Sequence, residues 1–476
     1  MALSTCESCL TNKVGTVPGR WHSLGKGSDN TQLHFPMFSR LKPAVSLLAL
    51  ALLGAGTARA QAVEVISDSL SLDGTLRSVL DANPSITNLT ELANAASGRL
   101  AQTRTGYLPQ VTGTATYTRI DPVVKLPLGG EVFQLAPNNN YDAHITAQYL
   151  LLDFGKNDAT AKLSESQVQT AQDNITVARR DLAFTAAQTY YNILFMRESI
   201  VVQDQQIASL QAHRNEMQKR VEGGVSTKFD VTTTDVRITQ AQNTKLDLVN
   251  QLRNQQVQLA RLLHKPGQTD IPVKGHLSFT PQPVDLNAEL AKAAENRPEI
   301  KLAHDAETTA SLQARLIEHS NMPTLGVGVQ VGAKNGYLPN LSQIKPNTLG
   351  VVQLSVPIYD GNKNKNQRVE ALANARSTVA RTQDTQEQIR SDVRQAANNM
   401  EFSQARYDNA QQQIAQSTDA LTRAQGRYRY GVGQNLDVLD AETQLAQARL
   451  ARAQAMYNYT LGQYQLKRAT GEQIWK

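Results

Sequence analysis

The chain has 476 residues, a formal net charge of +6, 40% hydrophobic residues, 5% aromatic residues and two cysteines. Length alone would suggest about three globular domains, but so few aromatic residues favour thin, extended packing over large compact cores. Residues 1–60 hold six Lys or Arg and two acidic residues, so +4 of the charge lies there and +2 remains downstream. We therefore expect no nucleic-acid partner, because no basic stripe with interleaved aromatic residues remains.

The N-terminal region has the features of a secretory signal peptide. Two basic residues precede an apolar run over 44–56, and a small-x-small motif follows at 58–60. The run is too short to cross a bilayer as a helix, and the motif fits the preference of signal peptidase. We expect cleavage near Ala60/Gln61, and we expect translation to start at Met37, which would make residues 1–36 an over-extended reading frame.

Cys6 and Cys9 lie upstream of this signal in a C-x-x-C arrangement. A redox or metal pair is the alternative interpretation, although no second pair accompanies it. An exported chain that lacks both residues has no disulfide, no thiol nucleophile and no lipid-acceptor cysteine. No later run of about 18 apolar residues occurs, so the export signal leaves either a soluble protein or a β-barrel.

The exported chain contains a long internal repeat. Asn83-Pro84 recurs as Arg297-Pro298 at an offset of 214, and Gly224-Val225 recurs as Gly431-Val432 at an offset of 207. Matches that keep one order indicate duplication of a unit of about 200 residues. We therefore expect three regions: the extension and signal at 1–60, a first structural repeat at 61–284 and a second at 285–476.

Each repeat is predicted to run helix, strand, strand, very long helix, helix. Apolar residues spaced three and four apart indicate coiled-coil seams; they are Val168, Ala171, Ile175, Ala178 and Leu182, and Ile389, Val393, Ala396 and Met400. No proline interrupts 157–222 or 362–430, so each helix would be about 100 Å long.

Glycines follow both long helices. Gly223-Gly224 and Gly431 are expected to supply left-handed positions at which the helices end and the chain reverses. Gly433 is the third expected helix-turn glycine, together with Gly224 and Gly431.

Four segments alternate apolar and polar residues with period two, at 111–120, 141–151, 324–332 and 348–358. This pattern over about ten residues is typical of outer-membrane strands, although a surface hairpin shows the same alternation. The intervening segments 121–140 and 333–347 are expected to be loops. Four strands are too few to close a barrel, so the chain would have to associate, and three copies would supply twelve strands.

The second helix turn has a distinctive sequence, with Arg-Tyr-Arg-Tyr-Gly-Val-Gly at 427–433 and Asp-Val-Leu-Asp at 437–440. These two segments and the element order over 70–471 resemble the TolC family of outer-membrane efflux ducts. The resemblance implies an α+β membrane protein, a homotrimer with a twelve-stranded outer-membrane β-barrel continued by a periplasmic α-helical coiled-coil tunnel. It also implies three further partners, a periplasmic adaptor (membrane fusion) protein, an inner-membrane pump of RND or ABC type, and outer-membrane lipid.

The same resemblance implies that Tyr430, Asp437 and Asp440 lie at the periplasmic entrance. Two aspartates three residues apart share a helix face, and three copies would place six carboxylates around one axis. The alternative is a helix first turn, where carboxylates are favoured in any protein. The turn 434–436 is short and uncharged, so it lacks the gating arginine that some members carry.

No enzymatic activity, cofactor or metal is predicted. Histidines downstream of the signal are scattered, and no H-x-x-x-H pair, G-x-S-x-G turn or phosphate-binding loop occurs. Tyr190-Tyr191, Tyr457 and Tyr459 are interpreted as helix-packing or aromatic-belt residues rather than a cofactor box.

The predicted function is passive conduction through an outer-membrane exit duct for substrates delivered by an inner-membrane pump. Efflux of small molecules is favoured, with type I protein secretion as the other use of such a duct. The competing class is a periplasmic coiled-coil adaptor or scaffold, which would not require two pairs of alternating ten-residue strands.

Overall fold

The computed structural model describes residues 70–475, apart from 129–130, 266 and 268–270. The expected extension and signal peptide at 1–60, including Cys6 and Cys9, lie outside the described residues. The elements below all belong to one unit of the chain, Glu64–Lys476.

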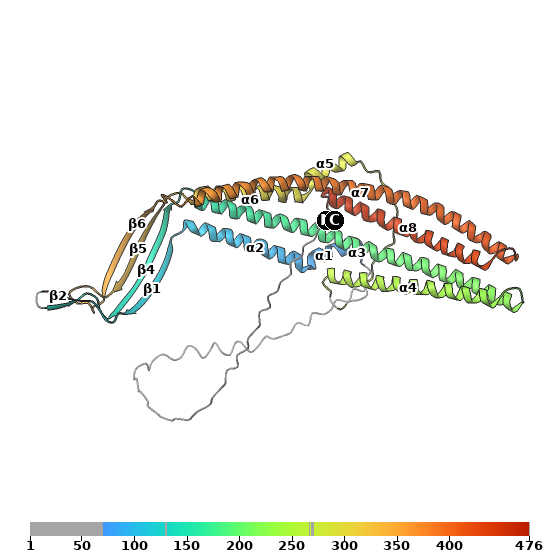
Figure 1. Cartoon of the computed structure of the whole chain (residues 1–476), viewed down its shortest axis with the longest axis horizontal. Helices are drawn as coiled ribbons and strands as arrows, with labels where there is room; N and C mark the ends of the chain where they lie inside the picture. The colour runs from blue at the N-terminus through green and yellow to red at the C-terminus, as the bar shows by residue number, and fades with distance from the viewer. Residues whose placement is uncertain (1–69, 129–130, 266, 268–270, 476) are drawn as a thin grey trace, which may run out of the picture. The chain divides into compact units, whose positions relative to one another are not determined.

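Helices make up most of the described chain (Figure 1). They are α1 (Leu72–Ala82), α2 (Pro84–Arg104), the short 3-10 helix η1 (Thr105–Tyr107), α3 (Lys156–Glu222), α4 (Lys228–Leu262), α5 (Leu286–Asn296), α6 (Pro298–Ser320), α7 (Lys363–Arg429) and α8 (Asn435–Thr470). Both α3 and α7 are uninterrupted over 67 residues, or about 100 Å. This confirms the predicted long helices.

The predicted element order occurs in both halves, with one difference. The helix expected before each strand pair is divided in two, and the second part begins at Pro84 or Pro298. Proline has no N–H and its ring clashes with the carbonyl four residues earlier, so it starts a helix more readily than it continues one.

The strands form one four-stranded antiparallel sheet in the order β1-β4-β5-β6. They are β1 (Gln110–Arg119), β4 (Asn139–Leu152), β5 (Thr324–Lys334) and β6 (Lys345–Ser355), which confirms the four predicted segments within a few residues. The prediction of a simple loop over 121–140 is wrong. That segment contains a hairpin of β2 (Lys125–Leu128) and β3 (Glu131–Gln134), whose four-residue strands are too short to give a clear alternation.

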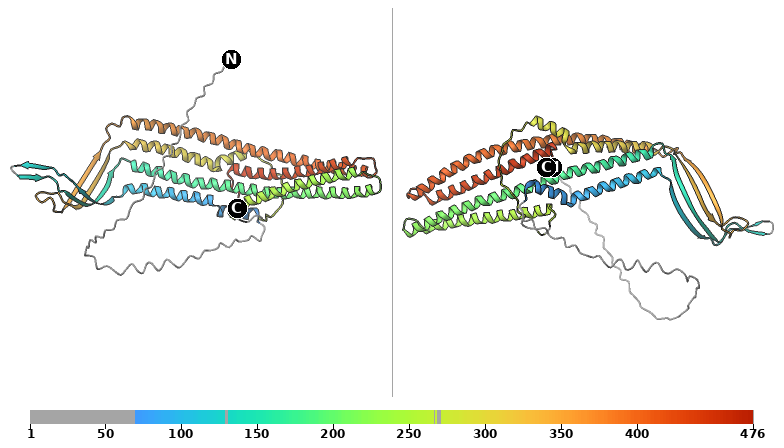
Figure 2. Two further views of the ribbon diagram at one scale, coloured as in Figure 1. Left: turned by 60° about the horizontal axis from the view of Figure 1, so that its bottom comes forward. Right: turned by 180° about the vertical axis from the view of Figure 1, so that it is seen from behind.

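The shorter helices pack along the two long helices α3 and α7. On the half near the strands, α2 packs on α3, and α6 packs on both α3 and α7. On the far half, α4 packs on α3, and α8 packs on both α7 and α3. Figure 2 shows the resulting arrangement, with the sheet at one end of the helices and the α3–α4 and α7–α8 turns at the other.

The predicted seam of α7 is confirmed, because Ile389, Val393, Ala396 and Met400 are at most 4% exposed. The predicted seam of α3 is only half-buried. This helix contacts α1, α2, α4, α6 and α8, and it buries a different set that includes Ala183, Ala187 and Ile193. Tyr190 and Tyr459 are also buried, which confirms their expected packing role.

A network of ion pairs joins α3, α6 and α7 near the middle of the helices. Arg180 is buried and donates from Nη1 to Glu299 Oε2 at 2.7 Å. Arg297, at the start of α6, donates from Nε to the same carboxylate at 3.0 Å and from Nη2 to Asp392 Oδ2 at 2.9 Å. Burial by itself would raise the pKa of Glu299, but the two guanidinium groups outweigh it and lower this pKa to about 2.

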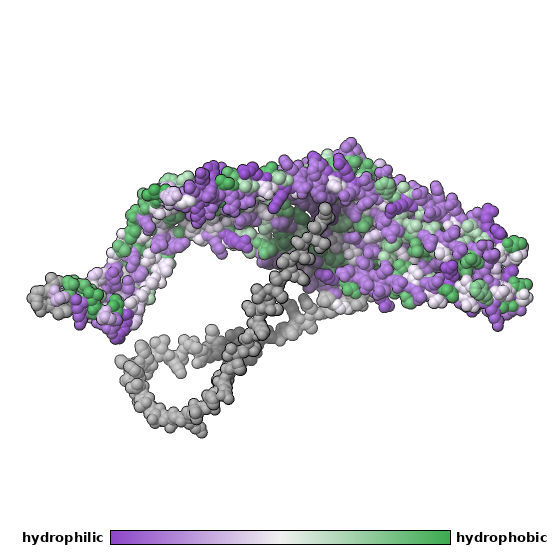
Figure 3. Space-filling view, viewed as in Figure 1, coloured by the Kyte–Doolittle hydropathy of each residue, from purple (hydrophilic) through white to green (hydrophobic). Residues whose placement is uncertain are grey.

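On the face seen in Figure 3 hydrophilic residues dominate the helices, and hydrophobic residues recur over the strands and at the far tip. Among the described residues, no helix combines the length and the apolar character needed to cross a membrane.

Candidate functional site

The turns after α3 and α7 are built in the same way. Gly224 and Gly431 adopt the left-handed conformation, with φ of 76° and 78°. The next residue closes each turn, because Val225 N donates to Arg220 O at 2.9 Å and Val432 N donates to Arg427 O at 3.0 Å. These bonds satisfy helix-terminal carbonyls in the manner of a Schellman motif. The predicted turn positions of Gly224 and Gly431 are confirmed, whereas Gly223 has a φ of −82° and is not left-handed.

Gly433 is required for a different reason. Its φ is outside the left-handed range, but a Cβ at this position would lie 3.0 Å from Arg427 Cβ and from Tyr428 N. Contacts this short are tighter than real Cβ atoms usually make. The chain therefore passes so close to the end of α7 that a side chain would displace the turn.

Asp437 and Asp440 are both exposed in the first turns of α8. Asp437 Oδ2 accepts a hydrogen bond from Gln434 N at 3.1 Å, as Asp230 Oδ2 does from Thr227 N at 3.3 Å in the first half. Asp437 thus stabilises the start of α8 in the same way that Asp230 stabilises the start of α4. Asp440 Oδ1 lies 3.6 Å from Arg237 Nη2 on α4, and both side chains are partly exposed.

Tyr430 and Tyr428 differ sharply in environment. Tyr430 is 85% exposed, whereas Tyr428 is 9% exposed. The Tyr428 ring packs edge-on against His213 at 5.4 Å and beneath the Arg220 guanidinium at 5.1 Å, and its hydroxyl lies 3.2 Å from Ser226 Oγ. Tyr428 therefore joins the α7–α8 hairpin to the α3–α4 hairpin, and its seven-residue spacing from buried Leu421 was a usable signal for it.

Asn435, the first residue of α8, makes a second link that sequence reasoning missed. It is 6% exposed. Its Nδ2 donates to Asp230 O at 3.2 Å and lies 3.4 Å from Thr234 Oγ1. Its Oδ1 therefore faces His213 Nε2 at 2.9 Å, which fixes this ring nitrogen as the donor. The Asn435 side-chain amide thus satisfies hydrogen-bonding groups on both α3 and α4.

Glu442 lies on the buried side of α8, 3% exposed. Burial raises the pKa of its carboxyl, while a hydrogen bond from Ser209 Oγ and the nearby His213 and Arg449 act in the opposite direction. A carboxylate on α8 thus contacts α3 about two turns from Asn435.

The two hairpin turns enclose a groove of about 460 Å³ lined by residues of both, from Arg220 to Asp230 and from Tyr428 to Leu436. Large apolar side chains around it are strongly exposed. They are Val225 at 69%, Phe229 at 76%, Tyr430 at 85%, Val432 at 68% and Leu436 at 49%. We call these five residues the apolar tip. Exposed apolar clusters of this kind mark interaction surfaces.

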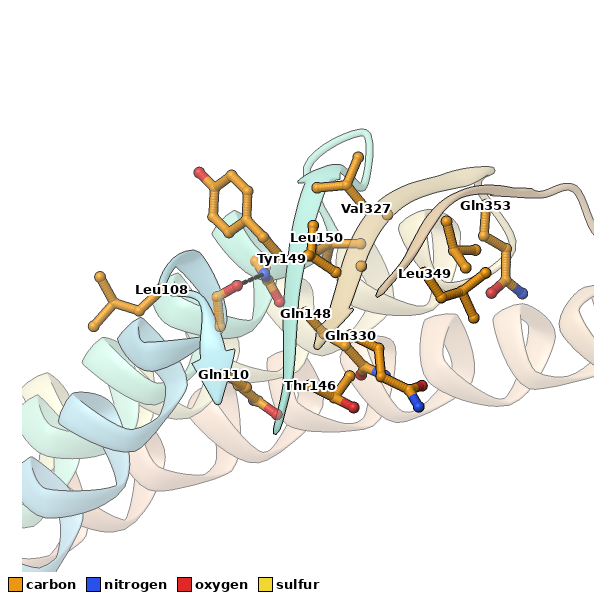
Figure 4. A pocket seen from close by; sticks show the side chains of 16 residues that line it. Leu108, Gln110, Thr146, Gln148, Tyr149, Leu150, Val327, Gln330, Leu349 and Gln353 are labelled. Atoms are coloured by element: carbon orange, nitrogen blue, oxygen red, sulfur yellow. Dashed lines mark hydrogen bonds between the residues drawn. The ribbon is translucent and has the colours of Figure 1, made fainter. Parts of the chain in front are cut away.

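The four-stranded sheet has two chemically distinct faces. The polar sheet face comprises the even-numbered positions of β1, β4 and β5 and the odd-numbered positions of β6, and the apolar sheet face comprises the others. Figure 4 shows Gln110, Thr146 and Gln330 on one side and Tyr149 and Val327 on the other, around a recess of about 460 Å³. On the apolar face Ile145, Val331 and Val352 are at least 54% exposed.

The described residues contain no group of three or more His, Cys, Asp or Glu that could hold a metal ion.

The outer membrane efflux protein family matches residues 75–264 and 290–472. The chain is 22% identical to outer membrane protein TolC of Escherichia coli over 404 residues, which cover 82% of this chain and 80% of TolC. The fold is similar to the CmeC outer membrane channel of Campylobacter jejuni, with a TM-score of 0.72, 18% identity and coverage of 85% and 87% of the two chains. It is equally similar to the outer membrane protein VceC of Vibrio cholerae, with a TM-score of 0.72, 19% identity and coverage of 84% and 96%.

The family match spans both halves of the chain and includes both helix turns and the four-stranded sheet. It confirms the resemblance found at the second turn and places the protein in the outer membrane. The chain belongs to the outer membrane efflux protein family.

Proposed function

We propose that three copies of the chain form a passive exit duct, with a twelve-stranded barrel in the outer membrane and a helical tunnel through the periplasm. In this proposal residues 61–284 and 285–476 act as two equivalent structural repeats, so that each trimer has six similar wall segments. Energy for transport comes from an inner-membrane pump and not from this protein.

The sheet is the observation that carries the proposal. Its outer strands β1 and β6 each have one neighbour, so one edge of each has backbone groups with no partner in the sheet. Such edges cannot face lipid, because each unsatisfied backbone group costs several kcal/mol there. Pairing β6 of one copy with β1 of the next removes all edges, and the apolar sheet face then contacts lipid while the polar face lines the interior.

The helices also support association. Ile175 and Leu182 of the predicted α3 seam remain half-buried in one copy, and Leu246 on α4 is 65% exposed. Neighbouring copies would cover such apolar positions along a coiled-coil tunnel.

The acidic residues Asp437 and Asp440 are proposed to surround the axis at the periplasmic entrance, with Tyr430 beside them. Both carboxylates are exposed in one copy, so threefold symmetry would bring six charges to a narrow opening that attracts cations and repels anions. Asp437→Asn with Asp440→Asn tests this. Asparagine keeps an oxygen that can accept the bond from Gln434 N, so the helix start is preserved.

The double variant is expected to lower cation preference in single-channel recordings. The control is Glu401→Gln with Asp408→Asn, two exposed α7 carboxylates that lie outside the proposed entrance. Equal ion selectivity in the wild type and the Asp437/Asp440 variant would mean that these residues only begin a helix.

The apolar tip is proposed to bind the periplasmic adaptor protein, which in turn joins an RND or ABC pump. Efflux of small molecules is the favoured use, because between its outer end and the helices the polar sheet face carries mainly glycines and uncharged Gln and Thr side chains. Type I protein secretion is the second candidate.

Three measurements test the duct. Cell fractionation should recover the protein with the outer membrane, crosslinking in detergent should give trimers, and purified trimers should conduct ions in planar bilayers. Recovery in the soluble periplasmic fraction would favour the scaffold alternative. A conducting monomer would contradict the argument from sheet edges.

A further inference from the structure

The charged residues of the polar sheet face lie in a single row across the sheet. Asp142 on β4 is aligned with Lys334 on β5, and Lys334 is aligned with Lys345 on β6. Among the described residues of this face, every other position is uncharged except His144 in the next row. The row lies at the strand ends farthest from the helices (Figure 1).

Neither lysine forms an ion pair within one copy, and the row, with one aspartate and two lysines, keeps a net charge of +1. Asp142 Oδ1 is 2.9 Å from His144 Nδ1, and no ion pair reaches Lys334 or Lys345 from the described residues. Lys334 Nζ lies 5.6 Å from the centre of the Tyr337 ring. Like charges that face each other on adjacent strands are destabilising, so the alignment of Lys334 with Lys345 is not explained by stability of the sheet.

We propose that Lys334 and Lys345, with their copies in a trimer, form a basic collar inside the outer end of the barrel that favours anionic solutes. This inference rests on the proposed trimeric duct. It adds a second charged zone, opposite in sign to the acidic entrance proposed at the periplasmic end.

The size of a twelve-stranded barrel makes the collar effective. Strands about 4.8 Å apart and tilted by about 40° give a backbone radius of about 12 Å. A lysine side chain reaches about 6 Å from its Cα, so the ammonium groups would lie about 6 Å from the axis. This is shorter than the Debye length of about 10 Å at 0.1 M salt and longer than the value of about 3 Å at 1 M. The electric field of the lysines should therefore extend across the lumen at low salt and be screened at high salt.

The direct test compares wild type with the Lys334→Gln/Lys345→Gln variant in planar bilayers under a KCl gradient. The potassium-to-chloride permeability ratio of the variant should rise by about threefold at about 0.1 M salt, and the difference should disappear at about 1 M. Lys125→Gln is the matched control, because this exposed lysine lies on β2, outside the four-stranded sheet. A conducting variant with the wild-type ratio at low salt would overturn the collar.

A labelling experiment tests the collar in channels that have already folded and inserted, so that a folding defect of the variant cannot affect the result. The only native cysteines are Cys6 and Cys9, so Lys345→Cys can be introduced into a background in which both are serine. Inserted channels are then treated with an anionic or a cationic thiol reagent. The cationic label should restore the wild-type ratio and the anionic label should raise it further, whereas equal ratios would refute the collar. A wild-type protein that does not conduct at all would instead refute the duct.

Discussion

Replacing Glu299 with glutamine removes the carboxylate that Arg180 and Arg297 share. Arg180 is 3% exposed and Arg297 is 7% exposed, so both guanidinium groups would stay buried with less compensation. A carboxyl pKa lowered from 4.5 to about 2 corresponds to about 3 kcal/mol of stabilisation at neutral pH. Removing one partner of a buried ion pair costs about 3 to 5 kcal/mol in other proteins. We therefore expect Glu299→Gln to destabilise the helical region by about 3 kcal/mol.

The assay is urea unfolding of the purified protein, followed by helical circular dichroism at several pH values. Because the folded pKa of Glu299 is lowered, its contribution is present above about pH 4.5 and is lost as the pH falls through about 2. Wild type should lose this part of its stability over that interval, and Glu299→Gln should not.

The control is Glu318→Gln, which removes an α6 carboxylate paired with Arg368 where both side chains are well exposed. An exposed pair contributes about 0 to 1 kcal/mol, so this variant should resemble wild type. The Arg180→Met/Glu299→Leu variant should be less destabilised than Glu299→Gln, because it leaves no unpaired charge at Arg180. Equal stability of Glu299→Gln and Glu318→Gln would refute the reasoning.

Three further predictions follow from single residues. Asn435→Ala should increase amide hydrogen exchange over the first turns of α8, because it removes the links to α3 and α4, and unchanged exchange would mean that the links carry no stability. Gly433→Ala should lower the melting temperature. Gly98→Ala should raise it slightly, because a Cβ at Gly98 meets no atom within 4 Å and alanine is more favourable than glycine in a helix by about 1 kcal/mol. Burial and a hydrogen bond with Asp173 raise the pKa of Asp305 to about 6. Wild type should therefore lose stability as the pH rises through about 6, and Asp305→Asn should not. Identical profiles of stability against pH for the two proteins would contradict this.

The sequence by itself determined the elements and their order. Long stretches without proline predicted α3 and α7, period-two alternation predicted the four strands, and Gly224 and Gly431 marked where the long helices end. These features follow from local backbone geometry and from which side of an element is apolar. Both properties depend on residues that are close together in the sequence. Short segments of this kind also carried the resemblance to the family.

The tertiary structure alone decided which polar side chains meet. Arg180 and Glu299 are 119 residues apart, and Asn435 and His213 are 222 apart, so no local period relates them. Sequence matching pointed to Tyr430, but it is Tyr428 that is buried between the hairpins, because the helix ends one residue before Tyr430 and turns it outward. The alignment of Lys334 with Lys345 likewise depends on strand register, which is fixed by pairing between strands and not by either strand alone.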